Sequence, residues 1–345
     1  MSKLWRKTLM NSGATLQQTI QNLNESALQI VLIVDSNERL IGTVTGALGM
    51  LGQHIMSELL LAGFNVVSVS RSSKNNESHG SWDLLHWKSD EEFDRLLSSV
   101  DVVIHAGAAV PGVHKPYSDD ELFYTNVGAS LNIARWCRKR SIPFIYISGA
   151  IVYDDPHNKG IKEDSKKGFN DFGGFYGQSK LFAEDLLNRE KDAGLSLSIV
   201  RPSSIYGYGL SAEKLVCIFL DKASNGHTIE IERPIEDCIN FIHAADVSNA
   251  IVKIIQKKEW DTFNISSGKC VSIIDLAKTC ISVVGNGKVI VSQKHQTREF
   301  LARYALNNKL SIKKLGWHPQ VNLFRGVRSI FEKKVIHAED ISSNH

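Results

Sequence analysis

The sequence predicts an α/β fold built on a doubly wound parallel sheet, with a smaller, discontinuous lobe in the C-terminal part. From about residue 39 to 199, short β-branched runs alternate with amphipathic helical stretches, which is the pattern of βαβ units. A glycine-rich turn joins the first run to the first helical stretch. After Arg201 the alternation breaks into shorter pieces without a low-complexity linker. We therefore expect two lobes that share a cleft.

Five apolar runs are the strand candidates, and the helical stretches between them carry apolar residues at three- and four-residue spacing. Connections between parallel strands are right-handed, so the sheet is expected to bind ligands at its carboxyl edge. The predicted strands are 41–45, 65–70, 100–105, 144–148 and 196–200, with helices at 51–62 and 179–193. The later pieces predict helices at 214–223, 244–256 and 273–284 and a strand at 227–231.

Composition excludes several classes of protein. The 345 residues are 43% hydrophobic and 22% charged, enough for a sizeable core in one large or two closely joined domains. The 40 basic and 37 acidic side chains are interspersed, so no nucleic-acid partner is expected. Five cysteines without a CxxC spacing argue against a disulfide framework and a metal site. No run suits a signal peptide or membrane span, which predicts a cytoplasmic protein.

The strongest local signal is the turn from Thr45 to Gly52, which follows a strand and opens a helix. Glycines there let backbone amides approach a pyrophosphate, and the helix N-terminus adds partial positive charge. The alternative is a turn that serves packing only. The residues expected to contact a dinucleotide are Gly46, Gly49, Met50, Leu51 and Gly52.

The end of the next strand bears on which dinucleotide binds. An acidic residue there would accept the ribose hydroxyls and favour NAD, but the sequence reads Ser70-Arg71-Ser72. A guanidinium at this place can pair with a 2'-phosphate, so the cofactor prediction is NAD(P) with a preference for NADP. Arg71 as a solvated loop cation is the alternative.

Tyr176 and Lys180 lie four residues apart, on one face of a predicted helix. A neighbouring ammonium is expected to lower the pKa of the phenol from about 10 toward working pH, which allows proton exchange with a substrate hydroxyl or carbonyl. A Y-x-x-x-K pattern alone recurs by chance. Its position downstream of the glycine turn makes this pair the catalytic candidate.

Over about residues 40–332 the sequence resembles the extended short-chain dehydrogenase/reductases, which include sugar-nucleotide epimerases, dehydratases and reductases. Several motifs in the same order carry the resemblance: the glycine turn, Trp82-Asp83-Leu84, residues 103–108, Asn126, the Tyr176/Lys180 pair, residues 201–207, residues 240–246, Phe263-Asn264-Ile265 and residues 315–319.

The resemblance implies a Rossmann-type sheet, a nucleotide-sugar substrate and a homodimer formed through two long helices. It also implies roles for particular residues. Asp83 and Leu84 would flank the adenine, Ala106, Gly107 and Ala108 would line the middle of the cofactor, Asn126 would shape the site, Tyr176 would be the acid/base, and Lys180 would hold the nicotinamide ribose. Arg298 or Arg303 would meet a nucleotide diphosphate, and His243 and Asp246 would either tie the lobes together or act in the site.

The sequence departs from the family where a third catalytic group, Ser or Thr, is usual. Gly149 occupies that place, and Ser148 precedes it. Adjacent side chains on a strand point to opposite faces, so three alternatives stay open. A bulge re-aims Ser148 as the catalytic hydroxyl, a water or substrate hydroxyl replaces it, or the enzyme is impaired.

The residues directly after Gly149 limit which reaction of the family is expected. The family's 4,6-dehydratases carry an Asp-Glu pair where this chain has Ala150 and Ile151, and water elimination needs an acid and a base. An epimerase or a 4-keto reductase is therefore expected. The alternative is a catalytically weak dinucleotide-binding sensor or scaffold.

About forty residues precede the first expected strand. Residues 1–39 resemble part of a CBS domain, which predicts a packing appendage or fusion remnant in preference to a working nucleotide sensor and hints at polysaccharide biosynthesis. The predicted organisation is this extension, an NAD(P)-binding domain at 40–201, a mainly substrate-binding lobe at 202–335 and a tail at 336–345.

Overall fold

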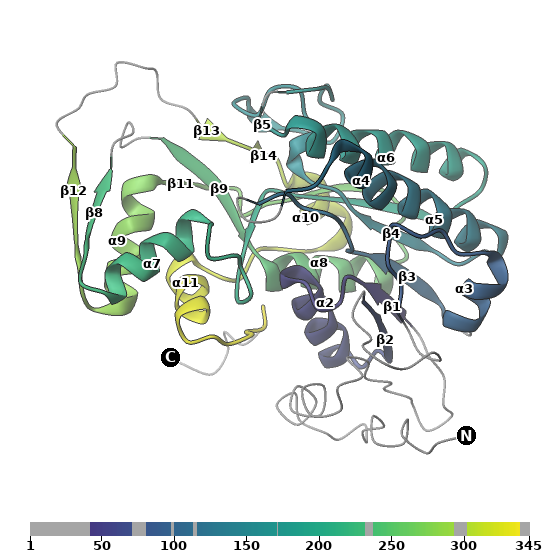
Figure 1. Ribbon diagram of the computed structural model, residues 1–345, viewed down its shortest axis with the longest axis horizontal. Coiled ribbons are helices and arrows are strands. Elements are labelled where there is room, and N and C mark those ends of the chain that lie inside the picture. Colours follow the sequence, from purple (N-terminus) through teal and green to yellow (C-terminus); the bar gives the residue numbers. More distant parts are fainter. Residues whose placement is uncertain are drawn as a thin grey trace.

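A computed structural model describes residues 42–70, 81–97, 100–112, 116–170, 172–231, 237–292 and 302–338. Its centre is a six-stranded parallel sheet of order β10-β6-β4-β3-β1-β2 (Figure 1). The doubly wound α/β prediction is confirmed. The strands are β1 (Gly42–Thr45), β2 (Val66–Val69), β3 (Val102–His105), β4 (Phe144–Ile147), β6 (Leu197–Pro202) and β10 (Thr262–Ile265). The first five fall on the predicted runs, whereas β10 was not predicted.

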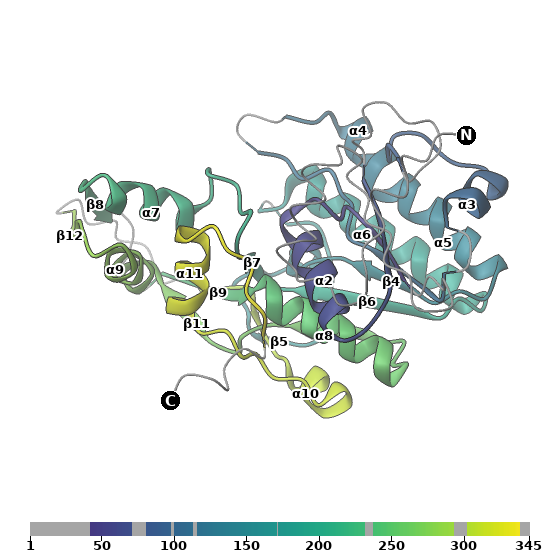
Figure 2. The same cartoon turned by 90° about the horizontal axis from the view of Figure 1, so that it is seen from below.

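Helices cover both faces of this sheet. One layer consists of α2, α8 and α10, and the other of α3, α5 and α6, as Figure 2 shows from a second side. With both faces covered, β2, β3, β4 and β6 are completely buried and do not alternate between apolar and polar residues. The bounds are α2 (Met50–Leu61), α3 (Asp90–Leu96), α4 (Asp119–Phe123), α5 (Ala129–Lys139), α6 (Gly174–Asp192), α8 (Ala244–Lys257) and α10 (Lys309–Leu315).

Helix α6 begins five residues earlier than predicted. The Asn170 side chain accepts hydrogen bonds from the N–H groups of Phe172 and Gly173, at 3.1 Å each. Its amide donates to the carbonyl oxygens of Ile151 and Tyr153, at 3.0 and 2.7 Å. Asn170 thus ties the start of the helix to the segment that follows β4, a long-range contact that local periodicity does not show.

The smaller lobe has a core of its own, and the chain passes between it and the sheet several times. Strand β9 (Cys238–His243) pairs with β7 (Ser204–Tyr206), β11 (Cys270–Ser272) and β13 (Ala302–Arg303), and it runs directly into α8. The lobe also contains α7 (Leu215–Ser224), α9 (Ile273–Val284), α11 (Leu323–Phe331) and the pair β8 (Thr228–Ile231) and β12 (Lys288–Val291). A further pair, β5 (Lys159–Ile161) and β14 (Ala305–Leu306), lies near the site.

The described residues form neither a membrane-spanning helix nor a metal-binding cluster. None of their helices is long and apolar enough to cross a membrane, and they contain no cluster of three His, Cys, Asp or Glu side chains placed to hold a metal ion. All five cysteines are free.

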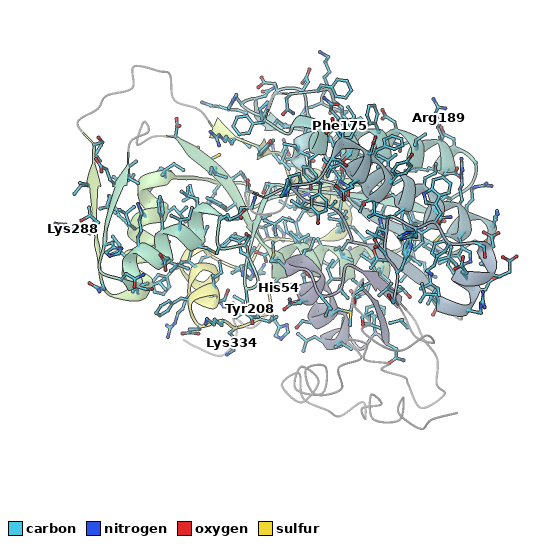
Figure 3. The ribbon with its side chains drawn as sticks, in the orientation of Figure 1. His54, Phe175, Arg189, Tyr208, Lys288 and Lys334 are labelled. Atoms are coloured by element: carbon cyan, nitrogen blue, oxygen red, sulfur yellow. The ribbon has the colours of Figure 1, made fainter. Side chains whose placement is uncertain are left out.

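Two buried histidines meet where the lobes join. His54 on α2 and His243 at the end of β9 have ring centroids 5.3 Å apart, and Figure 3 shows His54 beside Tyr208 at this junction. Burial lowers the pKa of His54 to about 4, although the Tyr208 backbone opposes the shift. Burial likewise holds the pKa of His243 well below its usual value.

These shifts predict a loss of stability in mild acid. The unfolded chain takes up a proton at His54 near pH 6.5, whereas the folded chain does so only near pH 4, so stability falls as pH decreases between these values. Between pH 7 and pH 5 we expect protonation of His54 to lower the free energy of unfolding by about 2 kcal/mol. Urea denaturation at pH 7 and pH 5 measures this change. The free energy of unfolding should fall less between the two pH values for His54→Gln than for the parent. Equal losses for variant and parent would contradict the prediction.

Candidate active site

The glycine turn packs so tightly that side chains cannot be accommodated. Gly46 has a φ of +70°, and a Cβ there would lie 2.7 Å from the Cα of Gly107. A Cβ on Gly52 would lie 2.1 Å from the Gly46 carbonyl oxygen. Helix α2 has no side-chain cap among the described residues and no acidic residue in its first turn. Its first N–H groups are therefore suited to an anion.

A buried threonine and histidine fix the turn to the neighbouring strand end. Thr45 Oγ1 lies 2.7 Å from His105 Nδ1, and the N–H of Gly107 donates to Thr45 Oγ1 at 3.3 Å. Burial lowers the pKa of His105 to about 3, with a contribution from the Lys180 charge. A neutral His105 therefore holds the carboxyl ends of β1 and β3 together.

Replacing Gly52 by alanine should weaken dinucleotide binding. The Gly46 carbonyl would have to move, a rearrangement that costs about 1–3 kcal/mol in a packed site, or roughly 5- to 150-fold in affinity. Titration with NADPH by fluorescence measures the change. Leu61→Ala, an exposed side chain at the far end of α2, is the control and should bind like the parent. Parent-like affinity of Gly52→Ala would contradict the close-approach argument.

Two adjoining cavities lie along the carboxyl edge of the sheet, and both include Gly46, Gly49, Ala106 and Ala108 in their walls. The structure brings most of the predicted site residues together here. The first cavity, of about 300 Å³, adds Asp83, Leu84 and Gly107. The second, of about 410 Å³, adds Met50, Leu51, Gly52, Ser148, Tyr176 and Lys180.

One predicted cofactor residue within the described part, Asn126, does not line either cavity. Arg71 lies outside the described residues, as do Arg298 and the CBS-like residues 1–39. Asn126 is buried and connects the segment after β3 to helix α6. Its side chain accepts from the Ala109 N–H, donates to the Ala109 carbonyl oxygen and donates to Ser179 Oγ at 3.0 Å. It lies in a π-helical turn, η2 (Tyr124–Gly128), a distortion that is common at functional sites.

The Tyr176/Lys180 pair lies on α6 in the wall of the larger cavity. Lys180 Nζ donates to the Ile147 carbonyl oxygen at 2.8 Å and lies 4.9 Å from the ring centroid of Tyr146. Burial raises the pKa of Tyr176 to about 12 and lowers that of Lys180 to about 8. The expected lowering of the tyrosine pKa is therefore wrong for this structure, because burial shifts it upward.

The Ser148 hydroxyl is hydrogen-bonded to a buried glutamate. The N–H of Ser148 continues the sheet ladder to the Val200 carbonyl at 2.8 Å, and its hydroxyl donates to Glu184 Oε1 at 2.5 Å. Gly149 is fully extended, and a Cβ there would meet its nearest neighbour, Ile151, at 3.8 Å. The Ser148 hydroxyl is thus bound to Glu184, and position 149 has room for a small side chain.

Sequence reasoning missed Glu184 and the role of Arg201. Glu184 follows Lys180 by one helical turn and forms two hydrogen bonds with Arg201, Nε to Oε1 at 2.9 Å and Nη2 to Oε2 at 2.6 Å. Arg201 also donates to the Tyr153 hydroxyl at 2.9 Å. Burial raises the pKa of Glu184, but Arg201, Lys167 and Ser148 outweigh it and hold the pKa below its usual value. The four-residue spacing between Lys180 and Glu184 is the sequence feature that could have indicated that both lie on one face of the helix.

The profile of the NAD dependent epimerase/dehydratase family matches residues 43–266, from β1 to the end of β10. The dTDP-4-dehydro-6-deoxy-D-allose reductase of Streptomyces bikiniensis is 26% identical over 265 residues, which cover 70% of this chain and 80% of the reductase.

Solved structures share the fold. UDP-N-acetylglucosamine 4-epimerase from Bacillus cereus superposes with a TM-score of 0.72 at 22% identity, over 84% of this chain and 95% of the epimerase. MoeE5 in complex with UDP-glucuronic acid and NAD gives a TM-score of 0.69 at 22% identity, over 85% of this chain and 98% of MoeE5. The Rossmann-type architecture of this chain is therefore that of known extended dehydrogenase/reductases.

Proposed function

Because the chain belongs to the NAD-dependent epimerase/dehydratase family, we propose that it is an NAD(P)-dependent enzyme acting on a nucleotide-activated sugar, as a 4-keto reductase or an epimerase. The observation that carries the proposal is the position of Tyr176 and Lys180 in a cavity that adjoins the glycine turn. The relatives named above act on or bind nucleotide sugars according to their names, which supports this substrate class.

The residues present fit a dinucleotide. The glycine turn leaves a space that a Cβ at Gly46 or Gly52 would fill, and Asp83 and Leu84 lie in the adjoining cavity, where an adenosine would reach. We keep the preference for NADP as part of the proposal, on the Arg71 side chain alone. When bound, the nicotinamide accepts a hydride from a sugar carbon or delivers one to it.

Tyr176 is the proton carrier in this scheme. As a sugar alcohol becomes a ketone it takes the hydroxyl proton, and as a ketone is reduced it donates a proton to the carbonyl oxygen. With a pKa of about 12, Tyr176 is a neutral phenol at pH 7. It is therefore ready to donate the proton that reduction of a ketone requires, in a reductase or in the second half-reaction of an epimerase. Lys180 contributes positive charge beside the reacting oxygen below its pKa of about 8.

Dehydration is not part of the proposal. The segment after β4 forms a short 3₁₀ turn, η3 (Ala150–Val152), in which the family's acid and base are replaced by apolar side chains. Ile151 packs so closely on the start of α6 that a Cβ at Gly173 would lie 2.6 Å from its Cγ1. The side chain at this position fills space and has no group that could remove a proton.

A second candidate is a dinucleotide-binding protein with weak catalysis. It rests on the absence of a side chain at Gly149 together with the engagement of Ser148 by Glu184. Gly149→Ser separates the candidates, because the position has room for a serine. A large gain in turnover would support the weak enzyme, and no gain would support a site that works without this hydroxyl.

The proposal is tested by titrating the protein with NADPH and NADH by fluorescence. The absorbance of the reduced cofactor is then followed with UDP-glucose, UDP-N-acetylglucosamine and a dTDP-4-keto-6-deoxy sugar. Tight NADPH binding with oxidation by the keto sugar is the expected result. Interconversion of UDP-sugars without net oxidation would point to the epimerase. Absence of binding to either cofactor would refute the proposal.

A further inference from the structure

The cavity that holds Tyr176 and Lys180 has a further phenol, Tyr304, in its wall. Tyr304 lies between β13 and β14 and has a φ of +54°. A left-handed backbone is unfavourable for a bulky side chain and persists only where the surroundings enforce it. Here its N–H donates to the Pro156 carbonyl at 2.8 Å, and its carbonyl accepts from the Leu306 N–H at 2.7 Å. The fold therefore holds this side chain in a fixed place.

The hydroxyl of Tyr304 lacks a partner within the described part of the chain. Tyr304 packs against a cluster of buried side chains, three of which come from the turn that follows Gly149. The cluster consists of Ala150, Val152, Tyr153, Ile161, Leu181 and Leu306. The Tyr304 hydroxyl oxygen is buried and makes no hydrogen bond to any described residue. A buried hydroxyl normally has a partner, and no described residue supplies one to Tyr304.

The electrostatics make Tyr304 a donor. Burial raises the pKa of Tyr304 to about 12, Arg303 opposes this shift, and a negative charge on Tyr176 adds to it. Both phenols lie in the wall of the same cavity. A phenol with this pKa keeps its proton at neutral pH, so it can donate a hydrogen bond but does not act as a base.

We propose that Tyr304 donates a hydrogen bond to the sugar oxygen that exchanges its proton with Tyr176, and so supplies the hydroxyl that position 149 lacks. The inference rests on the proposed function. It accounts for three observations together: the side chain missing at Gly149, the Ser148 hydroxyl bound to Glu184, and the unpartnered phenol in the same cavity. It also extends the site to β13 and β14, beyond the segment matched by the family profile.

The test is Tyr304→Phe, which keeps the ring. Turnover of the most active sugar nucleotide in the panel above should fall roughly 10- to 100-fold, the loss of a hydrogen bond to a group that carries developing charge. The KM for the sugar nucleotide and the NADPH affinity should stay within about 3-fold. Adding Gly149→Ser to Tyr304→Phe should recover a large part of the lost turnover. Tyr124→Phe, an exposed tyrosine, is the matched control.

The remaining outcomes overturn the inference. Parent-like turnover of Tyr304→Phe would remove the role of the hydroxyl while leaving the proposed function intact. A loss without recovery in the double variant would show that the hydroxyl acts on a different atom. If the parent protein binds NADPH but neither turns over nor binds UDP-glucose, the proposed function fails, and the role of Tyr304 fails with it.

Discussion

Tyr176→Phe is expected to lower turnover by about 10²- to 10⁴-fold, the usual contribution of a positioned acid or base, while cofactor affinity stays near that of the parent. The phenol lies in the wall of the larger cavity, and burial raises its pKa to about 12, so at neutral pH it carries the proton that a carbonyl oxygen needs. Phenylalanine keeps the ring and removes only this proton. Steady-state assays measure turnover, and NADPH fluorescence measures affinity.

The control for this experiment is the same change at an exposed position. Tyr124→Phe removes a hydroxyl from the surface and should leave both turnover and affinity unchanged. A Tyr176→Phe protein that retains more than a tenth of parental turnover would assign the proton transfer to another group. A loss of both turnover and NADPH binding would instead indicate damage to the site as a whole.

The largest loss of stability is expected from Glu184→Ala. Glu184 and Arg201 are both almost completely buried, and their side chains form two hydrogen bonds of 2.9 and 2.6 Å. Removing the carboxylate leaves a buried guanidinium without its counter-charge, which typically costs about 3–5 kcal/mol. The change also releases the Ser148 hydroxyl. Urea denaturation at pH 7 measures the free energy of unfolding.

A surface ion pair provides the matched control. Glu332 pairs with Arg328 on the exposed side of α11 at 2.6 Å, so Glu332→Ala should cost less than about 1 kcal/mol. The folded-state pKa of Glu184 lies below its unfolded value of 4.5. Its stabilisation is therefore present above pH 4.5 and is lost as pH falls further. The difference in free energy of unfolding between the parent and Glu184→Ala should therefore become smaller below pH 4.5. Equal costs for the two variants at pH 7 would contradict the buried-pair argument.

The parts of the fold that local patterns encode were predictable. Apolar runs of four to six residues predicted five of the six sheet strands, because a strand covered on both faces must be apolar throughout. The glycine spacing identified the turn at Gly46 and Gly52, where the structure shows no room for a Cβ. The four-residue spacing of Tyr176 and Lys180 placed both on one helix face, and α6 confirms that placement.

Other features depend on contacts between distant segments. Strand β10 joins the sheet beside β6 by backbone pairing across more than sixty residues, and a short apolar run does not reveal its partner. Helix α6 starts early because Asn170 binds the segment after β4. The pKa of Tyr176 rises where its spacing from Lys180 suggested a fall, because the degree of burial follows from packing and not from sequence spacing.

The sequence by itself therefore determined the class of sheet, the tight glycine turn and the candidate proton carrier, since each depends on residues that are close along the chain. Only the tertiary structure decided what the neighbouring groups do. It directs the Ser148 hydroxyl to Glu184, 36 residues away, and it brings Tyr304 from the C-terminal part into the cavity of Tyr176. Side-chain direction and burial at these positions are set by long-range packing, which the order of residues does not display.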